Sequence, residues 1–306
     1  MQLRTRTLAV VPLAATAAVF AVAGCGGSST SAPAAPAPAP APATAPAPTP
    51  APPAAAATET HDTAAMSDTD AMAMMTVHTG ATVSIDQPAG GAVVEGNAVD
   101  THATFGDFQL DCTRAGTANT DGSGHYHLEL DHSLIDMFCS EDGRISLQDV
   151  APGEHTIQVV PAANDHAEDH DALKEVAFEY QPTDPLPAVQ PVSFDAPPSI
   201  RIVSPAAGAT VSGEFDLTVE VQNFNLSCDL YGKHDVAGYG HWHANVDTTT
   251  EGMMGMATML GMSCANTFHV SLAGIAPGEH TFFAILENNL HAPTPEVQAQ
   301  VTVNVA

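Results

Sequence analysis

The chain carries one ordered series of short motifs twice, and this internal repeat limits its possible folds more than any other feature. GHYHLELD begins at Gly124, and GHWHANVD begins at Gly240, 116 positions further along. In both copies a Phe-x-Leu-x-Cys stretch precedes this motif, and Ala-Pro-Gly-Glu-His-Thr and then Asn-x-His follow it. Repetition of a whole series of motifs indicates two homologous domains in tandem.

The spacing of the motifs also places an insertion and the domain boundaries. The offset between the copies is 116 up to the GHxH motif and 125 from the Ala-Pro-Gly-Glu-His-Thr motif onward, so copy two carries nine additional residues, the difference between these offsets, before its second cysteine. We predict domains at 80–181 and 198–306, joined by a proline-rich linker at 182–197. Roughly 220 residues are enough for two domains of ordinary size.

The first 79 residues differ from the repeats. Residues 1–24 have two arginines before a mostly apolar run, as in a secretory signal peptide. The run ends in Val-Ala-Gly before Cys25, which resembles the lipobox of bacterial lipoproteins, and the resemblance implies that Cys25 is lipidated and becomes the N-terminus. An ordinary secreted protein is the alternative. Residues 25–79, rich in Ala and Pro and then in Met, His and Asp, are predicted to be a disordered tether.

Each copy is predicted to be all-β. Short segments that alternate apolar and polar residues are separated by Gly, Pro, Asn and Asp, which is typical of strands. In copy one the predicted strands are 82–86, 98–105, 125–131, 144–149, 155–160 and 174–180. The order of the motifs resembles that of bacterial immunoglobulin-like domains, with Tyr126 and Trp242 at the position of the buried strand C aromatic. The resemblance implies two tandem immunoglobulin-like β-sandwiches.

Four cysteines remain after Cys25, two in each copy. One pair per repeat in an oxidising compartment predicts one disulfide per domain, Cys112–Cys139 and Cys228–Cys264. A thiolate metal site is the alternative, although no pair has the CxxC spacing. The second cysteine of each pair precedes the predicted strand E, whereas the immunoglobulin bridge joins strands B and F.

Strand alternation separates the GHxH histidines from the residues between them. His125 and His127 share one face of their strand and Tyr126 lies on the other, and copy two repeats this with His241 and His243. Because the apolar face is expected in the core, we predict that the histidines point outward to solvent. Imidazoles at i and i+2 can share one metal ion.

A third histidine completes each predicted cluster. In a sandwich of this kind strands C and F are neighbours, so the loop after strand F lies near the start of strand C. The sequence therefore predicts two metal clusters, His125, His127 and His166 in copy one and His241, His243 and His291 in copy two. His155 and His280 also match between the copies, but at the opposite end of strand F, where a structural hydrogen bond is expected and a role as ligand is the weaker alternative.

Three neutral imidazoles suit zinc or copper. Thioethers favour Cu(I), and the insertion in copy two is rich in methionine, namely Met253, Met254, Met256, Met259 and Met262. The predicted tether adds Met66, Met72, Met74 and Met75. This methionine content favours copper as the ion in copy two. The alternative is that the methionines are plain hydrophobic filler. Calcium is disfavoured, because Asn119-Thr-Asp-Gly-Ser lacks the twelve-residue loop that ends in Glu.

Composition and motifs narrow the function. A formal charge of −28 excludes binding to nucleic acid through phosphate contacts. The sequence has no GxSxG, HExxH or P-loop motif, so an enzyme is not expected. The pattern GHxH, PGxHT and a later histidine resembles an uncharacterised bacterial family of small exported β-domains, which implies fold and location only.

Three interpretations therefore stay open. The first is a non-enzymatic lipoprotein of the cell envelope, on the periplasmic or cell-surface side, that binds copper or zinc. The second is a structural or adhesive module without metal, and the third is a zinc-dependent hydrolase. The partners predicted under the first are a metal ion and, through the lipid anchor alone, a membrane. Whether a protein partner exists, and which one, is left unknown by the sequence.

Overall fold

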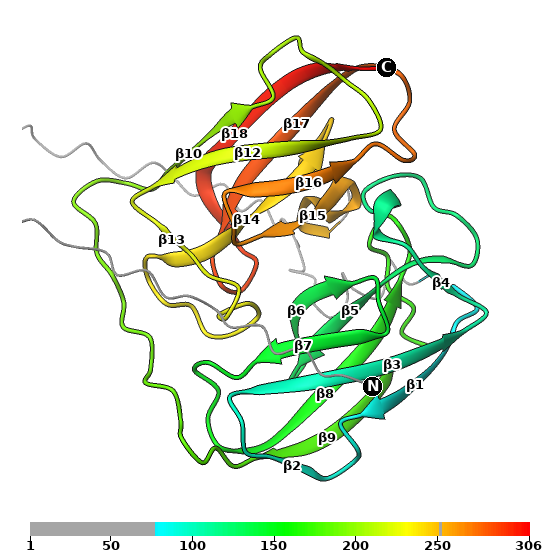
Figure 1. Cartoon of the computed structure of the whole chain (residues 1–306), viewed down its shortest axis with the longest axis vertical. Coiled ribbons are helices and arrows are strands. Elements are labelled where there is room, and N and C mark those ends of the chain that lie inside the picture. The colour runs from blue at the N-terminus through cyan, green and yellow to red at the C-terminus, as the bar shows by residue number, and fades with distance from the viewer. Residues whose placement is uncertain (1–76, 251–252) are drawn as a thin grey trace, which may run out of the picture. The chain divides into compact units, whose positions relative to one another are not determined.

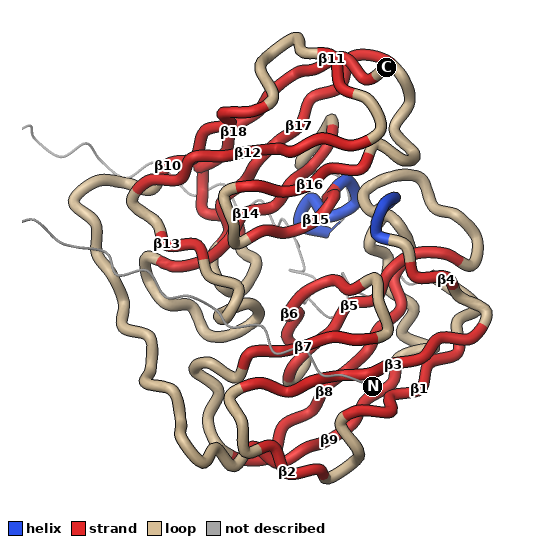
Figure 2. Tube along the Cα trace, in the orientation of Figure 1, coloured by secondary structure: helices blue, strands red, loops and turns tan. Residues whose placement is uncertain are grey.

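The computed structural model describes residues 77–250 and 253–306. The predicted signal peptide, Cys25, nearly all of the predicted tether and its methionines lie outside these residues. Figure 1 shows the described chain as two β-sandwiches, and Figure 2 shows that strands make up most of both. Within the described residues, no helix has both the length and the apolar character that a membrane span requires.

The first sandwich consists of two sheets. One has the order β1-β3-β7 and the other the order β2-β9-β8-β5-β4. Strand β6 also pairs with β5, on the side opposite β8. The elements are β1 (Thr82–Gln87), β2 (Ala92–Val94), β3 (Ala98–Gly106), β4 (Gln109–Leu110), the 3₁₀ turn η1 (Cys112–Arg114), β5 (Ser123–Leu130), β6 (Ser133–Phe138), β7 (Asp142–Ser146), β8 (Gly153–Ala162) and β9 (Lys174–Tyr180).

The second sandwich repeats this topology. Its sheets have the orders β10-β12-β16 and β11-β18-β17-β14-β13, with β15 paired to β14. The elements are β10 (Ser199–Ser204), β11 (Thr210–Val211), β12 (Glu214–Gln222), β13 (Asn225–Leu226), β14 (Tyr239–Val246), the 3₁₀ turn η2 (Met253–Thr258), β15 (Met259–Ser263), β16 (Thr267–Ser271), β17 (Gly278–Glu287) and β18 (Pro293–Val305). The nine-residue insertion lies between β14 and β15 and contains η2.

The sheet orders confirm the predicted immunoglobulin-like fold. A sheet of strands A, B and E faces a sheet of strands G, F and C, and the edge strand beside C corresponds to C′. In β5 and β14 the residues predicted for the core are there, since Tyr126, Leu128, Trp242 and Ala244 are at most 1% exposed. Alternation of side chains along each strand therefore assigned the apolar face correctly.

Each sandwich contains one disulfide. Cys112 is bonded to Cys139 with a Cα–Cα distance of 5.5 Å, and Cys228 to Cys264 with 5.3 Å. These are the two pairs that the sequence predicts, and each bridge joins the segment before strand C to the segment after the C′ strand. Bonds of this kind persist in oxidising compartments.

The two sandwiches contact each other through the sheets that contain β5 and β14. The described residues belong to one compact unit, and Tyr231 and Met262 of the second sandwich pack against the core of the first. The side chain of Lys233 in the second sandwich also reaches the first, where its Nζ donates a hydrogen bond to Ser146 O at 2.7 Å. These contacts cover the sheet faces that carry the GHxH histidines.

Candidate metal centres

The histidines of the GHxH motifs are buried, and the prediction that they point to solvent is wrong. His125 and His241 are 0% exposed, and His127 and His243 are at most 6% exposed. Their faces of β5 and β14 do lie opposite the apolar cores, as predicted, but the contact between the sandwiches covers them. Each central strand is therefore buried on both sides.

Three ring nitrogens converge in the copy-one cluster. His125 Nε2 lies 3.2 Å from His127 Nε2 and 3.0 Å from His166 Nδ1, and the latter two atoms are 3.3 Å apart. Four tetrahedral ligands at about 2.0–2.1 Å from zinc are spaced about 3.3–3.4 Å from one another. The three nitrogens are thus spaced much as three ligands of one tetrahedral ion would be.

The neighbours of this cluster fix which nitrogens carry protons. His127 Nδ1 lies 2.6 Å from Glu168 Oε1, and His166 Nε2 lies 2.7 Å from Met259 O. A carboxylate and a carbonyl can only accept, so each of these ring nitrogens donates its proton. The remaining nitrogens of His127 and His166, which face the centre of the cluster, are therefore lone-pair acceptors. Metal-bound histidines are oriented by partners of this type.

The third histidine of each copy has an unusual backbone conformation. His166 has φ 63° and His291 has φ 60°, in the left-handed region that non-glycine residues rarely adopt. Both lie in the short loop after strand F, which places the imidazole over the start of strand C. Such conformations cost about 1–3 kcal/mol and cluster at functional sites. The matching φ in both copies indicates that the loop geometry was duplicated together with this histidine.

The copy-two cluster has nearly the same arrangement. His241 Nε2 lies 2.9 Å from His243 Nε2, and one ligand atom from each of these residues and His291 lies within 4.8 Å of the others. The ring centroids of His241 and His291 are 4.6 Å apart, against 4.5 Å for the equivalent pair in copy one. Figure 1 labels the strands β5 and β14, which carry the two GHxH motifs.

The carboxylate near the copy-two cluster is placed differently. Glu287 Oε1 is 3.8 Å from His243 Nδ1, too far for a hydrogen bond, and Glu287 Oε2 has no hydrogen-bond partner among the described residues. Burial raises the pKa of Glu287 to about 9, so this side chain is a neutral acid at pH 7. In copy one, burial opposes the charged form of Glu168, but the hydrogen bond from His127 and the charge interactions with the nearby histidines together outweigh it and lower the carboxyl pKa.

Each cluster is tied to the opposite sandwich through its third histidine. His166 Nε2 donates to Met259 O in β15, and His291 Nε2 donates to Leu134 O in β6, at 2.7 and 2.9 Å. Strands β6 and β15 are equivalent in the two repeats, so the contacts are reciprocal. The interface therefore resembles that of a twofold dimer built within one chain.

Two matched glycines permit this close approach. Gly116 and Gly232 have φ 72° and 64°, and a Cβ on either would collide with backbone of the other sandwich, at Met259 and Leu134 respectively. A side chain there would separate the carbonyls from the histidines that donate to them. The glycine of the GHxH motif acts within its own domain, because a Cβ on Gly124 would collide with the carbonyl of Ala162 in β8.

Burial keeps the cluster histidines neutral. Together with the nearby His127 it lowers the pKa of His166 to about 3, and it lowers the pKa of His291 to about 4. Burial also lowers the pKa of His125 and His241 well below the usual 6.5. Neutral imidazole is the form that binds a metal ion. At pH 7 these four imidazoles are therefore neutral.

His155 and His280 lie at the opposite end of strand F, as predicted. His155 Nδ1 is 2.7 Å from Asp131 Oδ2 and its Nε2 is 2.8 Å from Ala151 O, and His280 makes the same two contacts with Asp247 and Ala276 O. Both are structural contacts at the turn. They also explain the aspartate that closes each GHxH motif, which anchors this turn.

The methionines of the insertion are partly core residues. Met256 is 9% exposed and Met259 is 1% exposed, so both fit the alternative of methionine as hydrophobic filler. The side chains of Met253 and Met254 lie outside the described residues. Met259 contributes its backbone carbonyl to the copy-one cluster. The preference for copper therefore stays a prediction.

Sequence analysis missed several residues around the clusters. Glu168 lies two positions after His166, but no pattern marks it, since its equivalent in copy two is Pro293. Glu287 ends strand β17, and Tyr231 packs over His241 with ring centroids 4.4 Å apart. Gly116 and Gly232, by contrast, were detectable from the 116-residue offset alone.

No protein-family profile and no curated protein sequence matches this chain. Among solved structures, the Clostridium thermocellum CbhA fibronectin(III)-like modules are 13% identical, covering 73% of this chain and 93% of that chain, with a TM-score of 0.23. A tetra-tandem repeat from the extending region of a large adhesion protein is 10% identical over 74% of this chain and 49% of that chain (TM-score 0.20). The FN1–FN3 domains of chicken CNTN1 are 7% identical over 71% and 64% (TM-score 0.22). Similarity at this level does not bear on function.

Proposed function

We propose that this chain is an exported, non-enzymatic module of the cell envelope in which two trihistidine metal centres join two immunoglobulin-like sandwiches. The ion is zinc or copper. The observation that carries the proposal is the convergence of three buried ring nitrogens, 3.0–3.3 Å apart, in copy one. The copy-two cluster repeats this arrangement with His241, His243 and His291.

A cation at the centre of the copy-one cluster would bind ring-nitrogen lone pairs that otherwise face each other. The proton of His127 is held by Glu168 and that of His166 by the Met259 carbonyl, so two lone pairs face each other at 3.3 Å. Burial removes the water that would otherwise separate them, and an unsatisfied buried polar group costs about 1–3 kcal/mol. A divalent ion at the centre would accept all three lone pairs at once.

Burial of the ligands favours a structural role. A catalytic zinc keeps an open position for water and substrate, whereas structural sites are closed. His125, His127 and His166 are at most 4% exposed, and the contact between the sandwiches covers them. Metal bound there would hold the two sandwiches together through His166 and His291, each of which reaches across the interface. This argues against the zinc hydrolase.

Export and anchoring rest on separate features. The signal-peptide pattern and the Val-Ala-Gly-Cys25 sequence support secretion and lipidation. The two disulfides fit an oxidising compartment. Lipid chains on Cys25 would attach the protein to a membrane surface without crossing it.

Metal content of the mature full-length protein, prepared without a His-tag, tests the proposal. We expect two equivalents of zinc or copper, and one equivalent after His241→Ala with His243→Ala. The control His269→Ala removes an exposed histidine and should leave two. Because the substituted side chains are buried, the double variant should also unfold at lower temperature. No saturable binding tighter than about 10 μM in the wild-type protein would favour the structural or adhesive module without metal.

A further inference from the structure

A second kind of donor lies beside the trihistidine clusters, at matched positions in the two copies. Met137 and Met262 each stand two residues before the second cysteine of their domain. Met137 is the direct strand partner of His127, and Met262 is the direct partner of His243. Residues directly opposite one another in a sheet project from the same face. Both thioethers therefore point from the histidine faces into the interface.

Each thioether reaches the opposite sandwich. Met137 Sδ lies 3.9 Å from where a Cβ on Gly261 would be, in strand β15 of the second sandwich. Met262 packs against the hydrophobic core of the first sandwich. This reciprocity matches that of His166 and His291. The two methionines thus belong to the same approximate twofold arrangement as the clusters.

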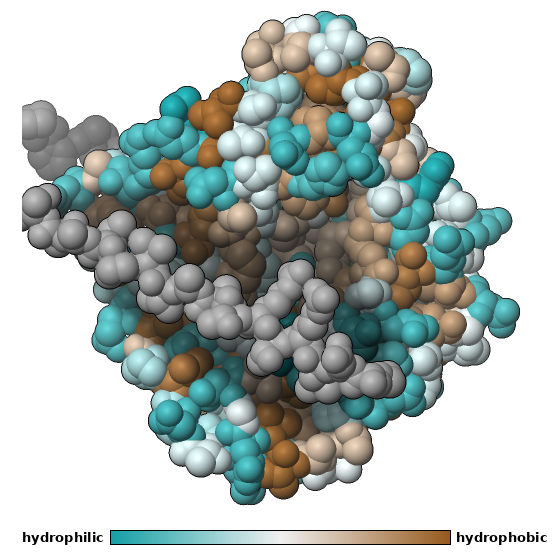
Figure 3. All heavy atoms as spheres, in the orientation of Figure 1, coloured by the Kyte–Doolittle hydropathy of each residue, from teal (hydrophilic) through white to brown (hydrophobic). Residues whose placement is uncertain are grey.

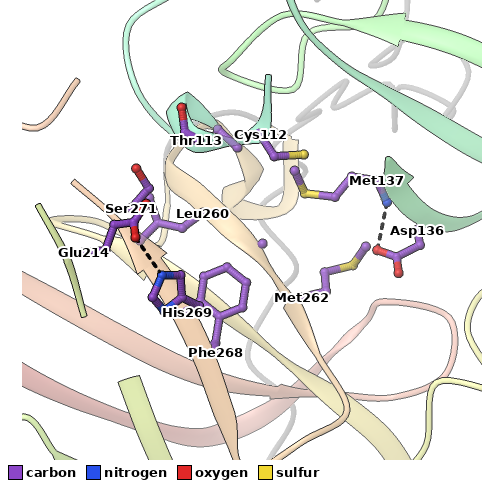
Figure 4. A pocket seen from close by; sticks show the side chains of 12 residues that line it. Cys112, Thr113, Asp136, Met137, Glu214, Leu260, Met262, Phe268, His269 and Ser271 are labelled. Carbon is purple, nitrogen blue, oxygen red and sulfur yellow. Dashed lines mark hydrogen bonds and ion pairs between the residues drawn. The ribbon is translucent and has the colours of Figure 1, made fainter. Parts of the chain in front are cut away.

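Both methionines line one cavity of about 350 Å³. Figure 4 shows their side chains projecting into the same space, with Asp136 beside them and with Glu214 and His269 across the cavity. Methionine in a core normally fills gaps. Here the two sulfur-bearing side chains border a cavity instead, on the same side of it.

We propose that Met137 and Met262 form a binding site for a soft monovalent metal ion, Cu(I) or a stand-in such as Ag(I), between the two sandwiches. Thioether sulfur prefers such ions and discriminates against zinc and calcium. The site is distinct from the trihistidine centres, because the ring nitrogens of His127 are directed at its own cluster and at Glu168. The inference therefore goes beyond the proposed function and does not depend on it.

Charge at the cavity favours a cation. Glu214 lines the cavity and Asp216 stands next to it, and both carboxylates are more than half exposed and contact His269. The chain as a whole carries a formal charge of −28, and clefts lined by one sign of charge concentrate ions of the opposite sign. Figure 3 shows hydrophilic residues over much of the visible surface of both sandwiches. A cation would meet carboxylates first and the sulfurs inside.

Silver titration of the mature full-length protein in the presence of saturating zinc tests the site. Zinc occupies histidine ligands, so silver reports on sulfur. We expect Met137→Leu with Met262→Leu, which nearly conserves volume, to remove one equivalent of bound Ag(I) and to leave the zinc content unchanged. Met256→Leu, the same substitution at a buried methionine of the second sandwich that does not line the cavity, is the matched control and should keep that equivalent.

A second measurement covers the case in which the double variant is damaged. In wild-type protein with ¹³C-labelled methionine methyl groups, the signals of Met137 and Met262 should shift together as the first equivalent of Ag(I) is added. The proposal is overturned if silver moves only other methionine signals, or if the double variant binds as much Ag(I) as Met256→Leu does. Absence of zinc binding in wild-type protein would contradict the proposed function, whereas the methionine signals and the comparison of the two variants would still report on this site.

Discussion

The two trihistidine clusters share their ligand positions but differ in the carboxylates around them. In copy one, Glu168 accepts a hydrogen bond from His127 Nδ1 at 2.6 Å, and the pKa of Glu168 is lowered. In copy two, Glu287 lies 3.8 Å from the equivalent nitrogen of His243, and burial raises its pKa to about 9. The duplication thus copied the ligands and the loop that presents the third histidine, but not the group that orients the second.

This difference predicts two centres of unequal strength. A carboxylate that receives the far proton of a ligating imidazole fixes the ring and increases its basicity. Among the described residues such a group lies beside copy one alone, so the copy-one centre should bind metal more tightly. In copy two, Tyr231 packs over His241 and restricts the ring by contact without adding charge.

The largest effect should come from Glu168, with Glu287 as the matched comparison. Glu168→Gln removes the charge that receives the His127 proton, and we expect the affinity of the copy-one centre to fall about 10- to 100-fold. Glu287→Gln replaces an acid that is already neutral with a neutral amide of the same shape, so the copy-two centre should change less than about threefold. Competition titrations with a chromophoric chelator resolve both. Equal losses in the two variants would show that the second sphere does not distinguish the centres.

Acid should destabilise the metal-free protein. In the unfolded chain histidine binds a proton at pH 6.5, whereas burial lowers the pKa of His166 to about 3 and that of His291 to about 4. Below pH 6.5 the unfolded state therefore holds more protons than the folded state, and stability falls as pH decreases from 6.5 toward 4. Urea unfolding of the apo protein at stepped pH measures this.

The acid prediction has a clear contrary result. Stability that stays constant from pH 7 to pH 4.5 would mean that the clusters take up protons in the folded state, and hence that water reaches them. Comparing wild type with His241→Ala and His243→Ala shows how much of the slope belongs to copy two.

The smallest effect should come from the other matched histidines. His155→Gln and His280→Gln each remove hydrogen bonds at the turn that starts strand F, and each should cost about 1–2 kcal/mol of unfolding free energy. Neither should change the metal content. If either variant lost an equivalent of metal, the assignment of these residues to the turn would be wrong.

The sequence predicted the repeat, the fold and the histidines, because each rests on local pattern. Alternation along β5 and β14 separates His125 from Tyr126, and the loop after strand F brings His166 to strand C. It could not predict what covers the outer face, since burial there depends on contact between two domains rather than on one strand. The C′ strands β6 and β15 were missed for a related reason. They form the strand edge beside the clusters, and their carbonyls at Leu134 and Met259 contact the other sandwich.

The partners of the clusters were also beyond sequence reasoning. Glu168 and Glu287 occupy different positions in the two repeats, so self-comparison discards both. The two methionines differ from these glutamates, because their positions do match between the repeats. Met137 and Met262 match at the same offset as the cysteines that follow them, but their meaning depends on the reciprocal interface that brings them to one cavity.

Anomalous X-ray scattering at the zinc edge, from crystals of the mature protein grown with zinc, tests the central claim most directly. The account predicts two strong peaks per chain. One should lie about 2.0–2.1 Å from His125 Nε2, His127 Nε2 and His166 Nδ1, and the other in the same position among His241, His243 and His291. Peaks only at exposed histidines such as His269, with both clusters empty, would contradict it.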